Sequence, residues 1–225
     1  MSGPLAQHLP DATLRRLSQY LRSLTEWGAA GTTTVSSARL ARAAGTTPAT
    51  LRKDLNLLGS HGRPGVGYQV DTLAPVLETA LGLTTPWRVA IIGAGHLGKA
   101  LSGYAGFTTR GFDVVAVLDS SPDVIGTVAS GVRVEDAATL EAVVQRAKVN
   151  MAVLTVPGPA AQRLVDRLAA AGVRSILSFA PLTVNAPDGV DVRRVDLSTE
   201  LQLLAHRAAP AGPPMPHRAP PLTQG

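Results

Sequence analysis

A glycine-rich loop near the middle of the chain has the spacing of a phosphate-binding turn. The loop is Gly93-Ala94-Gly95-His96-Leu97-Gly98, a G-x-G-x-x-G pattern that follows a predicted buried strand at residues 87–92. Gly93 would permit the tight turn, Gly95 the close approach of a pyrophosphate, and Gly98 the close packing of the next helix on the strand. The N-terminus of that helix would offer N–H donors to the phosphates. The loop predicts a dinucleotide site; a Rossmann-type scaffold that binds no nucleotide is the alternative.

An acidic residue follows the next apolar strand, residues 113–118. Asp119 lies 21 residues beyond Gly98, close to the spacing of roughly 20 expected for the carboxylate that binds the adenosine ribose. A carboxylate there repels a 2′-phosphate, and residues 120–123 contain no arginine that could bind one. The predicted cofactors are therefore NADH and NAD+ rather than their phosphorylated forms.

Three later strands are expected to end near the nicotinamide, because ligands of parallel sheets lie beyond the carboxyl ends of the strands. The loops after Val156, Phe179 and Val195 would border that ring. The candidate cofactor contacts in these loops are Val156, Pro157, Phe179 and Pro181.

The chain offers no convergent set of residues for hydride-transfer catalysis. It contains no cysteine, and its five histidines show no metal-ligand spacing. The Rossmann-like pattern ends near residue 196, which leaves no second domain to bind a substrate. We expect a protein that binds NAD(H) without a metal and without being an enzyme.

A second group of candidate residues lies on a short predicted helix between Thr47 and Leu58. At about 100° per residue its leucines share one face, and small, polar and basic residues share the other. Such residues contact base edges and phosphates when a helix enters a major groove. The candidate DNA contacts, including two from the next loop, are Ala49, Thr50, Arg52, Lys53, Asn56, His61 and Arg63. Asp54 lies on the flank, where we expect it to pair with a local cation.

The elements around that helix predict a winged helix. One helix is indicated by leucines at 14, 17, 21 and 24, a second runs from Ser36-Ser37 to Gly45, and the third begins at Thr47-Pro48. Glycines at 59, 62, 65 and 67 then predict a hairpin whose tip presents Arg63 to a groove. A three-helix packing or dimerisation module is the alternative.

Charge and hydropathy also separate the chain into regions. Residues 1–70 contain eight of the 21 Lys and Arg residues and three of the 16 acidic residues, so the whole net charge of +5 lies there. This asymmetry favours a polyanion-binding module, with an Arg-rich solvated surface as the alternative. No apolar stretch approaches the roughly 18 residues of a membrane span, and no secretion signal opens the chain. We therefore expect a cytoplasmic location.

Together these patterns predict an α/β protein with an N-terminal winged helix-turn-helix and a C-terminal Rossmann-like parallel sheet. The predicted boundaries are 1–86 for the DNA-binding domain, 87–196 for the NAD(H)-binding domain, 197–207 for a last helix, and 208–225 for a Pro-rich disordered tail.

The order of these motifs resembles the Rex family of bacterial redox-sensing transcriptional repressors over about residues 10–207. The similar segments are Leu51-Arg52-Lys53-Asp54-Leu55, Gly65-Val66-Gly67-Tyr68, the loop from Gly93 to Gly98, Gly106-Phe107, Phe179-Ala180-Pro181 and Val195-Asp196-Leu197. The resemblance implies a homodimer with a domain-swapped C-terminal helix, residues 197–207. It also implies palindromic operator DNA of respiratory and fermentative genes as the partner, with release by NADH and binding favoured by NAD+.

The resemblance further implies a switch between the domains. Arg22, Tyr104 and Asp196 match family positions that connect the nicotinamide pocket to the DNA-binding domain of the partner subunit, with an ion pair between Arg22 and Asp196. The sequence departs from the family where Leu57-Leu58 replaces an aromatic pair and where Arg63-Pro64 stands in place of a basic residue just before Gly65. Both departures bear on how the wing contacts DNA.

The predicted function is thus a DNA-binding repressor that senses the NADH/NAD+ ratio. Two alternatives remain open. One is a small Rossmann-fold NAD- or CoA-binding enzyme, and the other is a DNA-binding protein whose Rossmann half only dimerises.

Overall fold

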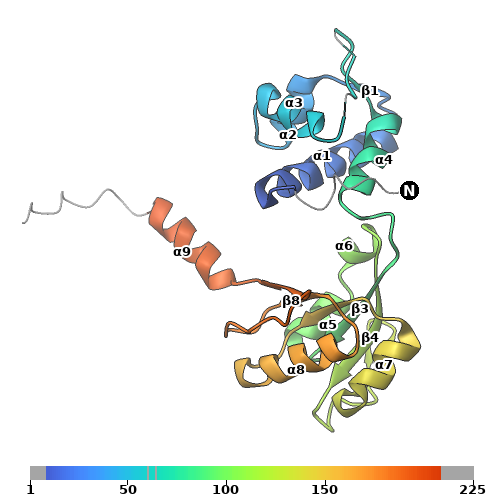
Figure 1. Ribbon diagram of the computed structural model, residues 1–225, viewed down its shortest axis with the longest axis vertical. Coiled ribbons are helices and arrows are strands. Elements are labelled where there is room, and N and C mark those ends of the chain that lie inside the picture. The colour runs from blue at the N-terminus through green and yellow to red at the C-terminus, as the bar shows by residue number, and fades with distance from the viewer. Residues whose placement is uncertain (1–8, 60, 64, 209–225) are drawn as a thin grey trace, which may run out of the picture. The chain divides into compact units, whose positions relative to one another are not determined.

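The chain forms two compact units, each with its own apolar core. The computed structural model describes residues 9–59, 61–63 and 65–208. Unit 1 comprises the residues up to Trp87 together with Gly106–Asp113. Unit 2 comprises Arg88–Ala105 together with the residues from Val114 onward (Figure 1).

Unit 1 is a small helical domain with a two-stranded sheet. Its elements are α1 (Asp11–Ala29), β1 (Thr34–Val35), α2 (Ser37–Ala43), α3 (Pro48–Asn56), β2 (Tyr68–Gln69) and α4 (Val70–Ala80). The hydroxyl groups of Ser36 and Thr47 cap α2 and α3 by accepting hydrogen bonds from backbone N–H groups at 3.2 and 3.1 Å. The core is filled by leucines from all four helices, each contributing about 1.5–3 kcal/mol by burial; they include Leu17, Leu24, Leu40, Leu51, Leu55, Leu73 and Leu77.

Two details of unit 1 differ from the predicted elements. α3 ends at Asn56 rather than Leu58, because its last turn tightens to hydrogen bonds between residues three apart. β1 has only two residues, too few to give an alternating pattern in the sequence. It pairs antiparallel with β2, with Val35 opposite Tyr68, and so holds the end of the hairpin against the helices.

Unit 2 is built on a seven-stranded sheet with the order β5-β6-β4-β3-β7-β8-β9. The strands are β3 (Trp87–Ile92), β4 (Phe112–Asp119), β5 (Val128–Ala129), β6 (Val132–Asp136), β7 (Met151–Leu154), β8 (Ser175–Ser178) and β9 (Asp191–Arg194). The β4/β6, β3/β7, β7/β8 and β8/β9 pairs are parallel, and β5 runs antiparallel to β6. The predicted Rossmann-like parallel sheet is confirmed.

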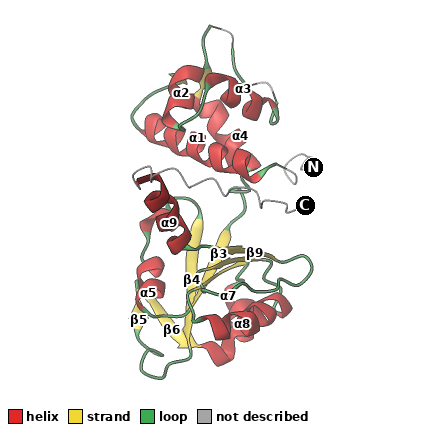
Figure 2. Ribbon diagram, turned by 90° about the vertical axis from the view of Figure 1, so that its left-hand side faces the viewer, coloured by secondary structure: helices red, strands yellow, loops and turns green. Residues whose placement is uncertain are grey.

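Helices cover the sheet as the crossover rule for parallel strands requires. They are α5 (His96–Ser102), η2 (Ala137–Thr139), α7 (Leu140–Ala147) and α8 (Gly158–Ala170). Two further helices are α6 (Ala105–Thr108), most of which belongs to unit 1, and α9 (Leu197–Ala208), which follows β9. The apolar faces of α7 and α8 pack together with the central strands in one core, whereas α5 lies on the opposite side of the sheet (Figure 2). The patterns in the sequence did not predict β5, β6, η2 or α7.

The last helix, α9, buries none of its side chains and extends away from the sheet of unit 2 (Figure 1). It covers the predicted residues 197–207 and continues to Ala208, where the predicted tail was expected to begin. Residues 209–225, and with them the rest of that tail, lie outside the described residues. Among the helices that the structure describes, none is long and apolar enough to cross a membrane.

Candidate DNA and dinucleotide sites

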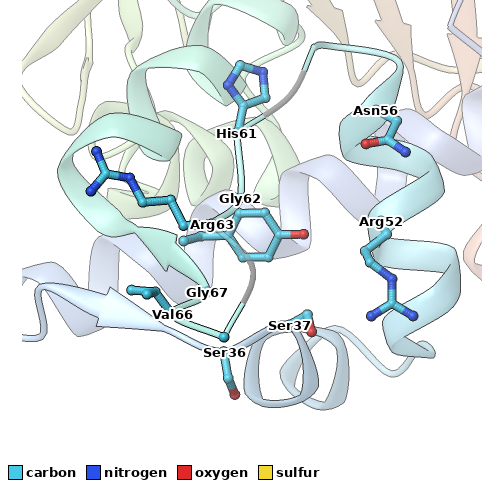
Figure 3. A pocket seen from close by; sticks show the side chains of 11 residues that line it. Ser36, Ser37, Arg52, Asn56, His61, Gly62, Arg63, Val66 and Gly67 are labelled. Atoms are coloured by element: carbon cyan, nitrogen blue, oxygen red, sulfur yellow. The ribbon is translucent and has the colours of Figure 1, made fainter.

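A cleft of about 460 Å³ lies in unit 1 between α3, the start of α2 and the wing, residues 61–68. Its lining residues are Ser36, Ser37, Arg52, Asn56, His61, Gly62, Arg63, Gly65, Val66, Gly67 and Tyr68. Figure 3 shows Arg52 and Asn56 on α3 to one side of the cleft and Arg63 on the wing to the other. Four of the seven predicted DNA contacts therefore line one cleft, while Ala49, Thr50 and Lys53 of the same helix lie outside it.

The wing is a tight turn that only glycine permits at one position. The N–H of Arg63 donates to the carbonyl of Gly67 at 2.9 Å, and the N–H of Gly67 donates back at 3.0 Å. Gly67 has φ +101°, and a Cβ there would lie 2.3 Å from the carbonyl oxygen of Val35. The turn leaves Val66 exposed at its tip. Pro64, one of the predicted departures from the family, lies outside the described residues.

Seven lining residues of the cleft were not among the predicted DNA contacts: Ser36, Ser37, Gly62, Gly65, Val66, Gly67 and Tyr68. The two serines were interpreted only as a helix cap, although in a helix-turn-helix this helix lies next to the recognition helix. Val66 had no signal of its own, because a single apolar residue between glycines does not distinguish a wing tip from an ordinary turn.

A buried carboxylate ties α3 to α1. Asp54 is 2% exposed. It accepts hydrogen bonds from Arg16 Nε at 2.6 Å, from a terminal Arg16 nitrogen at 2.7 Å and from the Tyr20 hydroxyl at 3.0 Å. The Thr13 hydroxyl donates a longer bond at 3.5 Å. The prediction that Asp54 pairs with a local cation is confirmed, and that cation is Arg16.

The pKa values of this cluster follow from its burial and its hydrogen bonds. Burial alone would raise the pKa of Asp54, but the hydrogen bonds from Arg16 and Tyr20 outweigh it and hold the pKa below its usual range. Burial raises the pKa of Tyr20, and its hydrogen bond to Asp54 raises it further. The cluster is therefore an ionised carboxylate bonded to a guanidinium and a neutral phenol.

In unit 2 the glycine loop adopts the geometry that its pattern predicts. Gly93 has φ +102°, and a Cβ on it would lie 2.7 Å from the Thr155 carbonyl oxygen. A Cβ on Gly98 would lie 1.8 Å from the Gly93 carbonyl oxygen, so α5 starts directly against the strand. A Cβ on Gly95 would meet nothing within 4 Å. Gly95 thus borders open space, as a residue approached by a ligand must.

Asp119 lies at the carboxyl end of β4, in register with Asp136 at the end of β6. One carboxylate oxygen of Asp119 accepts a hydrogen bond from the Ala94 N–H at 2.5 Å, and the other accepts one from the Ser121 N–H at 2.8 Å. The carboxylate is thereby fixed beside the glycine loop. Each oxygen retains lone pairs with which it can accept ribose hydroxyl protons.

A second cleft, of about 730 Å³, runs along the carboxyl ends of these strands. Its lining residues are Ile92, Gly93, Gly95, Asp119, Ser120, Asp136, Ala137, Ala138, Thr155, Val156, Pro157, Pro159, Ala160, Arg163, Leu164 and Arg167. It brings together five of the predicted cofactor contacts: Gly93, Gly95, Asp119, Val156 and Pro157. It does not include the other seven: Ala94, His96, Leu97, Gly98, Tyr104, Phe179 and Pro181.

One end of this cleft is held by Arg167, which sequence reasoning missed. Arg167 donates two hydrogen bonds to the carboxylate of Glu141, at 2.6 and 2.7 Å. It also donates to the carbonyls of Ala137 and Ala138, at 2.9 and 3.1 Å. The hydrogen bonds from Arg167 lower the pKa of Glu141 to about 2. The acid at the end of β6, Asp136, was the available signal for a ligand-facing loop here.

The three predicted switch residues belong to different units, Arg22 to unit 1 and both Tyr104 and Asp196 to unit 2. Arg22 pairs with Glu26 on its own helix at 3.1 Å. Asp196 caps α9 by accepting hydrogen bonds from two backbone N–H groups at 3.0 and 3.3 Å, and it contacts Arg194. Tyr104 is half exposed. The ion pair between Arg22 and Asp196 across subunits stays a prediction. No group of three or more potential metal ligands occurs among the described residues.

Comparison with known proteins assigns the chain to one family. Residues 84–182 match the family model described as a CoA binding domain, and residues 8–56 match the one described as a putative DNA-binding protein N-terminus. The redox-sensing transcriptional repressor Rex of Streptomyces griseus is 49% identical over 205 residues, which span 91% of this chain and 81% of the relative. The Rex repressor of Desulfitobacterium hafniense is 42% identical over 196 residues, 87% of this chain and 93% of the relative.

Solved structures agree with the sequence relatives. The crystal structure of RSP, a Rex-family repressor, matches with a TM-score of 0.79 and 34% identity, covering 89% of this chain and 94% of that one. RSP in complex with β-NAD+ and operator DNA matches with a TM-score of 0.83 and 35% identity, covering 89% and 93%. The chain belongs to the Rex family of redox-sensing transcriptional repressors.

Proposed function

We propose that this chain is a transcriptional repressor that binds operator DNA through unit 1 and is released when unit 2 binds NADH. The observation that carries the proposal is the presence in one chain of a basic helix-and-wing cleft and a dinucleotide cleft. RSP, which matches most of the chain, has been crystallised with β-NADH and with β-NAD+ and operator DNA.

On the DNA side, α3 enters the major groove of a palindromic operator and the wing contacts the adjacent groove. Arg52 and Asn56 have the donor and acceptor groups that read base edges, and Arg63 adds positive charge from the wing. Lys53 is exposed beside them and binds phosphate. Thr50, Ala49 and His61 complete the contact surface.

On the nucleotide side, Asp119 binds the adenosine ribose and the backbone around Gly95 faces the pyrophosphate. NAD(H) supplies the redox state that is sensed, and no bond in it is broken. The nicotinamide half lies toward Val156 and Pro157. Phe179 and Pro181, which follow β8, and Tyr104, which follows α5, contact the same half. The rest of the glycine loop, from Ala94 to Gly98, sets the shape of the turn.

The active species is a homodimer in which α9 is swapped into the partner subunit. Leu197, Leu201 and Leu204 lie on one side of α9 and are each about 60% exposed or more in the single chain. A helix with that apolar stripe needs a partner surface to bury it. Arg22 and Asp196 then meet across the subunits and report the state of Tyr104.

Rex relatives are regulators rather than enzymes, and we propose that this chain likewise turns over no substrate. Its partners, operator DNA and NAD(H), place it in the cytoplasm. The regulated genes are those of respiration and fermentation, whose products determine the NADH/NAD+ ratio.

One titration tests the proposal. The labelled complex of the full-length protein with a palindromic operator, selected by the protein itself from random-sequence DNA, is titrated with NADH, NAD+ and NADPH. NADH is expected to dissociate the complex, whereas NAD+ and NADPH are not. An equal response to NADH and NAD+ would remove the sensor function, because a ligand with no differential affinity shifts no equilibrium.

A second candidate function is favoured by one finding, the match of residues 84–182 to the CoA binding domain. CoA contains an adenosine and a pyrophosphate, so the same glycine loop suits both ligands. Competition between CoA and NADH for the purified protein separates them. Displacement of NADH by micromolar CoA would support CoA binding, and no displacement at millimolar CoA would exclude it.

A further inference from the structure

The proposed recognition helix, α3, carries one buried charged residue, Asp54, between the residues proposed to face DNA. Arg52 and Lys53 precede Asp54 in the chain and Asn56 follows two positions later. Asp54 itself points into the domain, where Arg16, Tyr20 and Thr13 of α1 surround its carboxylate. The proposed contacts with DNA make no use of this carboxylate.

The geometry of this cluster is directional. Two hydrogen bonds of 2.6 and 2.7 Å join the guanidinium of Arg16 to the two carboxylate oxygens, so the planes of both groups are aligned. The Tyr20 hydroxyl bonds to one of those oxygens from a second position on α1. Donors from two turns of one helix thus fix one residue of another.

Apolar contacts alone would fix α3 less sharply. Leu51 and Leu55 are buried and hold the helix against the core, but apolar burial is non-directional and tolerates small rotations. A shift of one residue turns a helix by about 100° and moves it about 1.5 Å. Even a fraction of that rotation would carry Arg52 and Asn56 away from the base edges they must reach.

We propose that Arg16, Tyr20 and Asp54 form a positioning network that sets the rotation of α3 and thereby the sequence specificity of operator binding. The inference rests on the proposed function of unit 1 as the DNA-reading domain. These residues touch no DNA and act through Arg52 and Asn56. Their contribution is to discrimination between sequences, and phosphate binding does not depend on it.

Stability and positioning can be separated because they respond differently to an apolar replacement. A buried ion pair exchanged for apolar residues of similar size is often neutral or stabilising. A buried polar network, by contrast, specifies one arrangement of the groups it joins. An apolar replacement of the whole network should therefore keep the fold and lose the specificity.

The decisive variant combines Arg16→Met, Tyr20→Phe and Asp54→Leu in the full-length protein. Affinity is measured for the selected operator and for a scrambled duplex of equal length at one salt concentration. Operator affinity is expected to fall at least about tenfold, in the range that one misplaced bidentate base contact costs. Scrambled-DNA affinity should change less than about twofold because phosphate contacts are tolerant of position, and NADH affinity should not change. An operator-to-scrambled ratio equal to that of the unaltered protein overturns the proposal.

Folding of unit 1 is checked by the fluorescence of Trp27. The other tryptophan, Trp87, lies where unit 1 meets β3, and Trp87→Phe in every variant leaves Trp27 as the single reporter. If the triple variant does not fold, Arg16→Lys decides by the same ratio. Lysine keeps the charge but loses the planar pair of donors, so a reduced ratio supports the network and an unchanged ratio overturns it.

The matched control is Glu135→Gln with Arg146→Gln, which removes an exposed pair in unit 2 in which one Arg146 nitrogen donates to both Glu135 oxygens, and it should leave the ratio unchanged. A control that lowers the ratio equally would overturn the proposal. Failure of the unaltered protein to select any operator would instead refute the proposed function.

Discussion

The two clefts of this chain are lined by different kinds of groups. In unit 1 the groups that face the cleft are side chains, among them Arg52, Asn56 and Arg63. In unit 2 the centre of the cleft is backbone, because Gly93 and Gly95 leave no side chain there and Asp119 is itself bonded to the N–H of Ala94. A DNA surface made of side chains can change its sequence preference by substitution, whereas the backbone groups of the glycine loop cannot be exchanged by substitution.

The ion pairs of the two units differ in how far their carboxylates are exposed to water. Asp54 is 3% exposed in its pair with Arg16, whereas Glu141 is 48% exposed in its pair with Arg167. Both pairs are bidentate, so their chemistry is alike and only their solvation differs. Loss of the arginine therefore leaves a buried carboxylate in unit 1 and a half-exposed one in unit 2.

The largest expected effect comes from adding a side chain to the glycine loop, residues 93–98. Gly98→Val adds a Cβ that would lie 1.8 Å from the Gly93 carbonyl oxygen, so the glycine loop must move. We expect NADH affinity to fall by more than about 100-fold, since the pyrophosphate subsite depends on that loop. Calorimetric titration with NADH measures the loss.

Operator binding by the same variant gives the contrast between the units. Because unit 1 has its own core, the Gly98→Val protein should still bind operator DNA and should no longer be released by NADH. Retention of NADH affinity within about threefold would show that the glycine loop is not the pyrophosphate site.

The second effect is a pH dependence of the stability of unit 1. The pKa of Asp54 is lower in the folded protein than in the unfolded chain, so its contribution is complete above about pH 4 and is lost as pH falls through the folded value. The pKa of Tyr20 is raised, so its contribution is complete below about pH 10 and is lost as pH rises through the folded value. Unit 1 should therefore lose stability at both extremes.

Urea unfolding followed by Trp27 fluorescence between pH 3 and 11 measures this dependence. We expect stability to fall as the pH approaches 3, and we expect this loss to be absent in Asp54→Asn, which should be less stable at neutral pH. Equal acid losses in both proteins would assign the effect to other carboxylates.

How far sequence reasoning reached differs between the units for a physical reason. The helix-turn-helix and the glycine loop depend on local signals, namely the caps at Ser36 and Thr47 and the turn at Gly93, which are readable from neighbouring residues. Asp54 was placed correctly on the flank of its helix from the 100° rule, but its partner Arg16 lies 38 positions away and no local pattern names it.

In the cleft of unit 2, one acidic lining residue could be predicted from the sequence, whereas two arginines could not. Asp119 was found because its distance from Gly98 is set by one strand-helix-strand unit. Arg163 and Arg167 reach the same cleft from α8, a helix that follows β4 only after three further strands, β5, β6 and β7. Their positions depend on the order β6-β4-β3-β7, which periodicity alone does not determine.

The third prediction concerns Arg167 of α8. Arg167→Met removes the donors that hold the Ala137 and Ala138 carbonyls, so the loop lining the adenosine end of the cleft loosens. We expect NADH affinity to fall about tenfold, equivalent to about 1.4 kcal/mol. Binding of ADP-ribose, which shares the adenosine half, should weaken equally. A loss for NADH with unchanged ADP-ribose affinity would place Arg167 at the nicotinamide end instead.

The smallest effect is expected for the pair of Arg146 and Glu135, which makes the comparison between buried and exposed pairs quantitative. Its two hydrogen bonds, at 2.8 and 2.7 Å, are nearly as short as those of Arg16 and Asp54. Its side chains, however, are 63% and 32% exposed. Arg146→Gln should change the free energy of unfolding by less than about 0.5 kcal/mol, because water solvates both charges once they separate.

Urea unfolding of the Arg146→Gln protein at low salt and at 1 M salt tests the reasoning. Any destabilisation should be smaller at 1 M salt, where the Debye length falls to about 3 Å and the attraction between solvent-exposed charges is weakened. A salt-independent loss above about 1 kcal/mol would mean that hydrogen-bond geometry, rather than burial, sets the strength of these pairs. The difference between the two units would then lie in their clefts alone.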